Sequence, residues 1–195
     1  MEGGMTKRVI VVCGNKHHGK DELAGFLKEQ LPDSEIRAYA DPLKEAVAII
    51  LGVPLEWMYD QDKKESVIRY GHTLRHWLQW FGTEIVRDQV DERAWTHRMG
   101  DHVLQSGCTT VIVPDGRFVN ESIALRAYLK ADAQIVTVRV LRPGYPVDLT
   151  HRSESEVANM PDSDFDHVVL NDGTLEDLQA EAKRLVGEIL GRLLQ

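Results

Sequence analysis

A glycine-bracketed lysine near the N-terminus is the first group of residues whose spacing could do chemistry. Gly14 and Gly19 enclose Asn15-Lys16-His17-His18, and Lys20 follows directly. Glycines at this spacing let backbone N–H groups turn inward around an anion, and the lysine then reaches the outer phosphates of a nucleotide. The same pattern also occurs by chance in simple turns, so the flanking residues must decide between the two interpretations.

The flanking residues favour a phosphate-binding loop. The β-branched run Val9–Val12 precedes it and predicts a strand buried on both faces. Apolar residues at helical spacing follow it: Leu23, Ala24, Phe26 and Leu27. One position departs from the usual motif, because Asp21 and then Glu22 stand where a Ser or Thr hydroxyl would bind Mg²⁺.

A carboxylate that ends a second apolar strand is the next candidate. Residues 109–113 predict a buried strand, and Pro114-Asp115 ends it. Asp at that place is typical of a Walker B element, which holds Mg²⁺ directly or through water. The alternative is an ordinary turn residue. Asp21 and Asp115 are therefore the candidate metal ligands.

The elements around these motifs alternate between strands and helices. Further strands are predicted over 35–39, 135–141 and 167–170, and helices are predicted to start at Asp41, Thr73, Asp91, Asn120 and Thr174. Residues 53–70 are expected to form an irregular surface excursion, and residues 145–166 are long enough for a lid. This alternation predicts an α/β fold with a parallel sheet of about five strands. Its helices cover both faces, and the motifs gather at the carboxyl ends of the strands.

Composition limits the possible partners. The 195-residue chain has 43% apolar and 28% charged residues and a net charge of −8. That charge argues against binding a nucleic acid polymer, which requires a basic surface. Two cysteines without metal-like spacing indicate small buried residues of a cytoplasmic protein. No apolar run approaches the roughly 18 residues that would cross a membrane.

Several stretches, in this order, resemble the deoxynucleoside monophosphate kinases of tailed bacteriophages. They are residues 14–21, Ala-Asp-Pro-Leu-Lys at 40–44, Arg-His-Trp-Leu-Gln-Trp-Phe-Gly-Thr-Glu at 75–84, Trp95, Val-Pro-Asp-Gly-Arg at 113–117, Glu121, Arg-Pro-Gly at 142–144 and Asn-Asp-Gly-Thr-Leu-Glu-Asp-Leu at 171–178. The resemblance implies one P-loop kinase domain over 1–195, with an acceptor-binding region at about 53–105 and a lid at about 143–166. ATP is the implied donor, Mg²⁺ the implied metal and a deoxynucleoside monophosphate the implied acceptor. The host cytoplasm is the implied location, and a homodimer is left open.

The resemblance assigns roles to individual residues. The donor side comprises Gly14, Asn15, Lys16, His18, Gly19, Lys20, Asp21, Glu22, Arg142, Asn171 and Gly173. The acceptor side comprises His17, Asp41, Leu43, Lys44, Arg75, Gly82, Thr83, Trp95, Asp115, Arg117 and Glu121. Lys20, Asp115, Arg117 and Arg75 are the expected catalytic residues. Because the acceptor phosphate is itself mostly dianionic, with a second pKa of about 6, the chemistry needs cations rather than a general base.

Two departures from the family pattern and two alternative functions complete the sequence-based interpretation. The family usually has Lys-Arg-Ser where this chain has Lys16-His17-His18, and Thr where it has Glu22. A kinase of another small phosphorylated metabolite, such as dephospho-coenzyme A, would need the same loop and arginines. A nucleotide-binding protein without turnover is the other alternative, suggested by the missing loop hydroxyl. The accepted bases and the choice between deoxyribose and ribose are not predicted.

Overall fold

The computed structural model describes residues 6–117, 119–147 and 152–191. The chain forms two compact units, one made of Met1–Ala38 with Gly100–Gln195 and the other of Tyr39–Met99. Helix α5 (Ala94–Gln105) runs across the boundary in the sequence between the two units. Within the described residues, no helix is long and apolar enough to cross a membrane.

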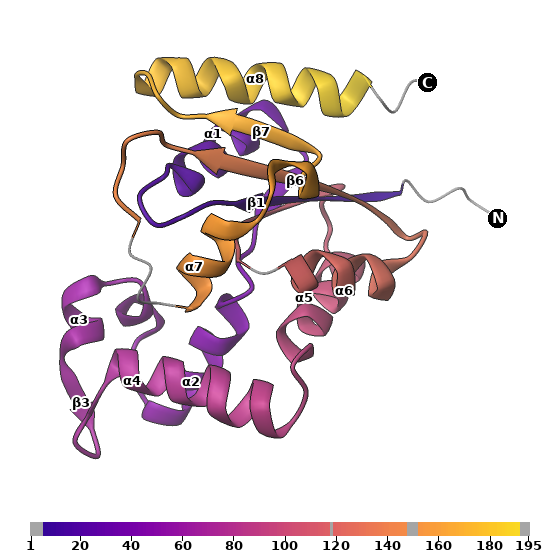
Figure 1. Ribbon diagram of the computed structural model, residues 1–195. Helices are drawn as coiled ribbons and strands as arrows, with labels where there is room; N and C mark the ends of the chain where they lie inside the picture. Colours follow the sequence, from indigo (N-terminus) through magenta and orange to yellow (C-terminus); the bar gives the residue numbers. More distant parts are fainter. Residues whose placement is uncertain (1–5, 118, 148–151, 192–195) are drawn as a thin grey trace. The chain divides into compact units, whose positions relative to one another are not determined.

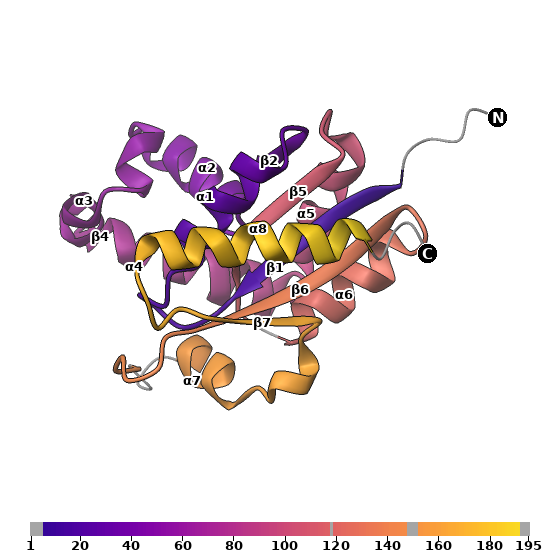
Figure 2. The same ribbon diagram turned by 90° about the horizontal axis from the view of Figure 1, so that it is seen from above.

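A parallel five-stranded sheet forms the centre of the first unit. Strand β1 (Lys7–Cys13) lies between β5 (Thr110–Gly116) and β6 (Ala133–Leu141), and the edges are β2 (Ser34–Ile36) and β7 (His167–Leu170). Figure 2 shows the resulting order β2-β5-β1-β6-β7. All four strand pairs are parallel, which confirms the predicted sheet. The edge strand β2 is shorter than the predicted strand over 35–39.

Helices cover both faces of this sheet. In Figure 1, α1 (Lys20–Gln30) and α8 (Leu175–Gly191) lie on one side, and α6 (Val119–Leu129) and α7 (Arg152–Asn159) on the other. Because side chains alternate along a strand, Ile10 and Val12 of β1 join the α1–α8 core, and their neighbours face the opposite layer. The complete burial of residues 9–12 explains why this strand reads as a continuous β-branched run.

The start of α8 follows its predicted cap. The Thr174 hydroxyl accepts the N–H of Asp177 at 3.2 Å, and the Asp177 carboxylate accepts the N–H of Thr174 at 2.8 Å. These two bonds satisfy N–H groups that a helix N-terminus leaves without partners. Leu178, Ala182, Leu185 and Ile189 form the buried face of α8, whereas Leu175 in its first turn is 56% exposed.

The second unit is built from short elements. They are α2 (Asp41–Leu51), a 3₁₀ turn (Leu55–Met58), α3 (Gln61–Glu65), a hairpin of β3 (Val67–Arg69) and β4 (His72–Thr73), α4 (Leu74–Gln79) and a π-helical segment (Trp80–Arg87). The prediction of an irregular excursion over 53–70 is therefore wrong. The Thr73 cap is confirmed, because its hydroxyl accepts the N–H of His76 at 3.1 Å. A small buried core lies under α2 and α4, and it includes Val47, Leu51, Met58 and Leu74.

The predicted lid stretch also contains regular structure. Helix α7 occupies its middle, and a 3₁₀ turn (Asp162–Asp164) lies between α7 and β7. Residues 148–151, which belong to the predicted lid, lie outside the described part of the chain. In the second unit, α2 starts at Asp41 as predicted, and its N-cap residue is Ala40.

Candidate active site

Two glycines of the predicted phosphate loop are required by close backbone and side-chain approaches. A Cβ on Gly14 would stand 2.6 Å from the carbonyl oxygen of Val140. Gly19 has a left-handed φ of 94°, and a Cβ there would stand 2.5 Å from Nδ2 of Asn171. The loop joins the buried strand β1 to α1, which is the context predicted for a phosphate-binding loop.

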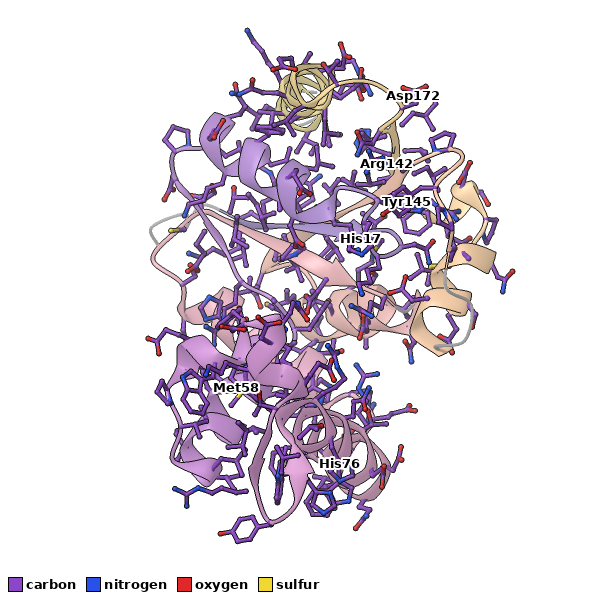
Figure 3. The ribbon with its side chains drawn as sticks, turned by 90° about the vertical axis from the view of Figure 1, so that its left-hand side faces the viewer. His17, Met58, His76, Arg142, Tyr145 and Asp172 are labelled. Atoms are coloured by element: carbon purple, nitrogen blue, oxygen red, sulfur yellow. The ribbon has the colours of Figure 1, made fainter. Side chains whose placement is uncertain are left out.

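Segments far along the chain hold the loop in place. The Asn171 side-chain amide donates to the carbonyl of His18 at 3.0 Å. The N–H of Arg142 donates to Nδ1 of His18 at 3.3 Å, and its guanidinium donates to the carbonyl of His17 at 3.4 Å. Figure 3 shows His17, Arg142 and Tyr145 together, with the Arg142 guanidinium 5.0 Å from the Tyr145 ring centre. The loop, the end of β6 and the turn after β7 thus form one connected structure.

The loop lysine lies in a partly buried, cationic environment. Lys20 Nζ donates to the carbonyl of Asn15 at 2.8 Å. Burial lowers the pKa of Lys20, and the nearby Arg117 charge lowers it further. The Glu154 and Asp21 carboxylates act in the opposite direction and raise the pKa of Lys20. Cations gathered in a partly buried site favour an anion beside them.

Asp115, Arg117 and Glu121 lie where β5 ends and α6 begins. The N–H of Arg117 donates to the buried carboxylate of Glu121 at 3.1 Å. Burial raises the pKa of the Cys13 thiol to about 12, and the Glu121 and Asp115 carboxylates add to that rise. Cys13 is thus a neutral, unreactive thiol, and Asp115 lies close enough to influence it. The other cysteine, Cys108, is half-buried rather than buried as predicted.

Two residues near the loop were not predicted as site residues. Glu154 of α7 accepts a hydrogen bond from the N–H of Lys16 at 2.8 Å and pairs with Arg117 at 3.2 Å. The other is Arg139 of β6, whose side chain is only 7% exposed. It donates to the carbonyl of Val157 near the end of α7 at 3.2 Å. A charged residue between apolar ones in a strand is the pattern that could have indicated this buried role.

Within the second unit, the predicted acceptor residues of α2 form a connected group. The carboxylate of Asp41 accepts hydrogen bonds from the Tyr59 hydroxyl at 2.9 Å and from Lys44 Nζ at 3.3 Å. Lys44 Nζ also lies 4.0 Å from the centre of the Tyr59 ring. These contacts hold the Asp41 carboxylate at the start of α2, where Ala40 rather than Asp41 occupies the N-cap position.

The other predicted acceptor residues lie on α4, the π-helical segment and α5. Arg75 Nε donates to Glu65 at 2.5 Å. Trp95 Nε1 donates to the carbonyl of Gly82 at 3.0 Å, and a Cβ on Gly82 would stand 2.6 Å from the Leu43 side chain. Thr83 is exposed.

About two thirds of the chain matches a known protein family. Residues 57–182 match the family described as deoxynucleotide monophosphate kinase. The chain belongs to this family. The phosphate loop lies before the matched residues, so its assignment depends on the geometry described above.

Individual relatives of the deoxynucleotide monophosphate kinase family agree. The chain is 29% identical over 190 residues to the "Putative deoxynucleotide monophosphate kinase" of Acanthamoeba polyphaga mimivirus, covering 89% of this chain and 93% of that protein. It is 30% identical over 144 residues to the deoxynucleotide monophosphate kinase of Enterobacteria phage T4, covering 65% of this chain and 56% of that protein. Among solved structures, shikimate kinase from Acinetobacter baumannii aligns with a TM-score of 0.51 at 14% identity. That alignment covers 97% of this chain and 96% of that one, and it supports the predicted P-loop kinase fold.

Two carboxylates are available for a metal in this family member. Asp21 is exposed in the first turn of α1, and Asp115 is half-buried at the end of β5. The described residues contain no cluster of three or more metal-ligating side chains. Mg²⁺ in kinase sites usually takes only one or two carboxylates and completes its shell with water and substrate phosphates. The donor set therefore fits Mg²⁺ held together with a nucleotide, and Glu22 beside Asp21 adds no hydroxyl.

Proposed function

We propose that this protein transfers the γ-phosphoryl group of ATP to a deoxynucleoside 5′-monophosphate, which yields ADP and a deoxynucleoside diphosphate. The match of residues 57–182 to the deoxynucleotide monophosphate kinase family carries the proposal. The loop geometry supports it, because Gly14–Lys20 has the form that binds a polyphosphate. Such an activity would supply DNA precursors in the cytoplasm of a host cell.

In this proposal the first unit binds ATP. Backbone N–H groups of the loop and the ammonium of Lys20 hold the outer phosphates, while Arg117 neutralises charge on the moving phosphoryl group. Arg142 and the turn from Asn171 to Gly173 lie beside the loop and are proposed to contact the rest of the nucleotide. Mg²⁺, held by Asp21 or Asp115 with the phosphates, would supply further charge neutralisation.

The second unit is proposed to bind the acceptor. Lys44 and Arg75 supply the cations for the acceptor phosphate. Leu43, Gly82 and Trp95 are proposed to line the region that holds the nucleoside. The acceptor phosphate needs no general base, because with a second pKa of about 6 it is mostly dianionic at neutral pH. The residues therefore act by positioning two anions and screening their repulsion rather than by moving a proton.

A substrate panel tests the proposal. The protein is mixed with Mg-ATP and, separately, with each deoxynucleoside monophosphate, each ribonucleoside monophosphate and dephospho-coenzyme A, and the products are separated by anion exchange. We expect ADP and a deoxynucleoside diphosphate in equal amounts. Preferred phosphorylation of the non-nucleotide acceptor would instead identify a kinase of another metabolite. ATP binding without any product would identify a nucleotide-binding protein that lacks turnover.

A further inference from the structure

The carboxylate of Glu154 lies within the phosphate loop, where an anion is expected to bind. Its Oε2 accepts the backbone N–H of Lys16 at 2.8 Å and the side-chain amide of Asn15 at 3.1 Å. Its Oε1 accepts from the Arg117 guanidinium at 3.2 Å. The side chain is only 9% exposed. A loop N–H, an amide and a guanidinium are the kinds of donor that hold a phosphate.

The charge balance around Glu154 favours the ionised carboxylate. Burial alone raises the pKa of Glu154, but hydrogen bonds from Lys16 and Asn15 and the charges of Arg117 and Lys20 outweigh it and leave the pKa lowered. The side chain is therefore an anion at neutral pH. A carboxylate with these partners places a negative charge where the family's donor nucleotide would place its outer phosphates.

The opposite end of α7 is held by a different contact. Arg139 of β6 donates to the carbonyl of Val157 at 3.2 Å and pairs with Asp162 at 2.9 Å. This anchor does not involve the phosphate loop. The C-terminal end of α7 can therefore stay attached to the sheet while Glu154, near the N-terminal end, changes its contacts.

We propose that Glu154 is an internal counter-anion that fills the phosphate loop in the absence of nucleotide and is displaced when the nucleotide phosphates bind. The inference rests on the proposed function, because it takes the ATP phosphates as the displacing ligand. Two anions cannot share the Lys16 N–H and the Arg117 guanidinium without strong repulsion, so the stronger polyanion expels the carboxylate. Nucleotide binding is thereby linked to release of the Glu154 side chain, which loosens the N-terminal end of α7 and leaves the Glu154 backbone carbonyl, an acceptor from the Asn15 side-chain amide at 2.8 Å, as its remaining described contact with the loop.

A carboxylate that occupies the site reduces the apparent affinity for nucleotide. Only the fraction of molecules with an open loop can bind, so the observed dissociation constant exceeds the intrinsic one by the inverse of that fraction. Removing the charge of Glu154 should increase the open fraction. Nucleotide binding should then tighten, whereas a residue that helps to hold the bound nucleotide would give the opposite effect.

The test is calorimetric titration with AMPPNP, a non-hydrolysable ATP analogue, and with inorganic tripolyphosphate, both without acceptor. In Glu154→Gln, we expect the dissociation constant of each probe to fall about tenfold, because the side chain keeps its shape but loses its charge. The matched control is Glu156→Gln, which removes an equal charge two residues further along the same helix. It should bind both probes as the wild type does.

Several outcomes would overturn the inference. Weaker binding in Glu154→Gln would show that Glu154 supports the bound state, and equal binding in both variants would show that the contact does not compete with phosphate. If Glu154→Gln fails to fold by circular dichroism, amide hydrogen exchange of the wild-type protein decides. AMPPNP should then speed exchange in α7, and slower exchange there would contradict displacement.

The readout separates this inference from the proposed function. Titration without an acceptor does not depend on which acceptor is phosphorylated. A protein that phosphorylates no deoxynucleoside monophosphate, yet binds AMPPNP more tightly as Glu154→Gln, would refute the proposed function alone. A normal kinase whose Glu154→Gln variant binds AMPPNP more weakly would refute the counter-anion alone.

Discussion

The two units of this protein present their polar groups in different ways. In the first unit, the phosphate loop follows a fully buried strand, and Arg142, Glu154 and Asn171 contact it from more than a hundred residues away. In the second unit, the described polar contacts of the predicted acceptor residues span at most 18 positions of the sequence, as between Asp41 and Tyr59. The phosphate loop is thus held by contacts from distant parts of the first unit, whereas the predicted acceptor residues are held by contacts over shorter stretches of the second unit.

The two units also differ in how completely they bury their apolar side chains. The central strand β1 has four consecutive residues with no exposure. The second unit contains short elements and leaves large apolar side chains exposed, with Ile49 at 81%, Tyr70 at 75% and Val67 at 65%. Fewer buried contacts imply lower local stability and easier rearrangement. In the proposed function the donor is always ATP, which suits a rigid loop. The acceptor must be selected among nucleotides, which suits an adaptable region.

The largest expected effect comes from the rigid side of this comparison. Replacing Lys20 with Ala removes the cation that is proposed to hold the outer phosphates, and kcat should fall about a thousandfold, as for other charge-stabilising groups in phosphoryl transfer. Steady-state kinetics with ATP and the best acceptor of the substrate panel measures this. Thermal unfolding should change little, because the variant removes from the described contacts a single hydrogen bond of the Lys20 ammonium, to the carbonyl of Asn15.

Lys28→Ala is the matched control for Lys20→Ala. Lys28 lies on the same helix, α1, and its side chain is exposed in the last turn. This variant should retain wild-type kcat. If Lys20→Ala retained substantial turnover, the loop would have no part in the mechanism and the contrast between the two units would lose its basis.

A smaller effect is expected from the adaptable side. Arg75→Ala should raise the KM for the acceptor about tenfold or more, the usual cost of losing a charged hydrogen bond, and should leave the KM for ATP nearly unchanged. Arg93→Ala, which removes an exposed guanidinium of the same unit paired with Asp91, is the control. A larger change in the KM for ATP than for the acceptor would contradict the assignment of Arg75 to the acceptor.

Sequence patterns predicted the elements whose causes are local. The run Val9–Val12 identified β1, the paired glycines identified the loop, and Thr174 identified the start of α8. Each depends on a few adjacent residues and on a rule that packing does not reverse. The site residues assigned from these patterns remain predictions of function, although the structure connects many of them around the loop.

Other features depended on contacts that no local pattern specifies. The position of Glu154 follows from the packing of α7. Glu154 lies 138 residues after Lys16, the loop residue whose N–H it accepts. The carboxylate of Asp41 is held by Tyr59, 18 residues later, and Ala40 rather than Asp41 is the N-cap of α2. The β3–β4 hairpin was missed because its turn has positive φ at Tyr70 as well as Gly71, and Tyr is an unusual residue for that conformation.

The smallest expected effect concerns stability rather than catalysis, and it tests how firmly the fold holds the loop. Burial lowers the pKa of His18, which is 4% exposed, so the unfolded chain takes up this proton at a higher pH than the folded protein does. The stability contribution of His18 is therefore full above the ordinary histidine pKa of about 6.5 and falls as pH decreases below it. Denaturant unfolding at pH 7 and 5.5 should show this loss in the wild type and in His17→Asn, the exposed neighbour, but a smaller loss in His18→Asn. An equal loss in all three proteins would mean that the loop rearranges to solvate His18, and it would then be no more rigid than the second unit.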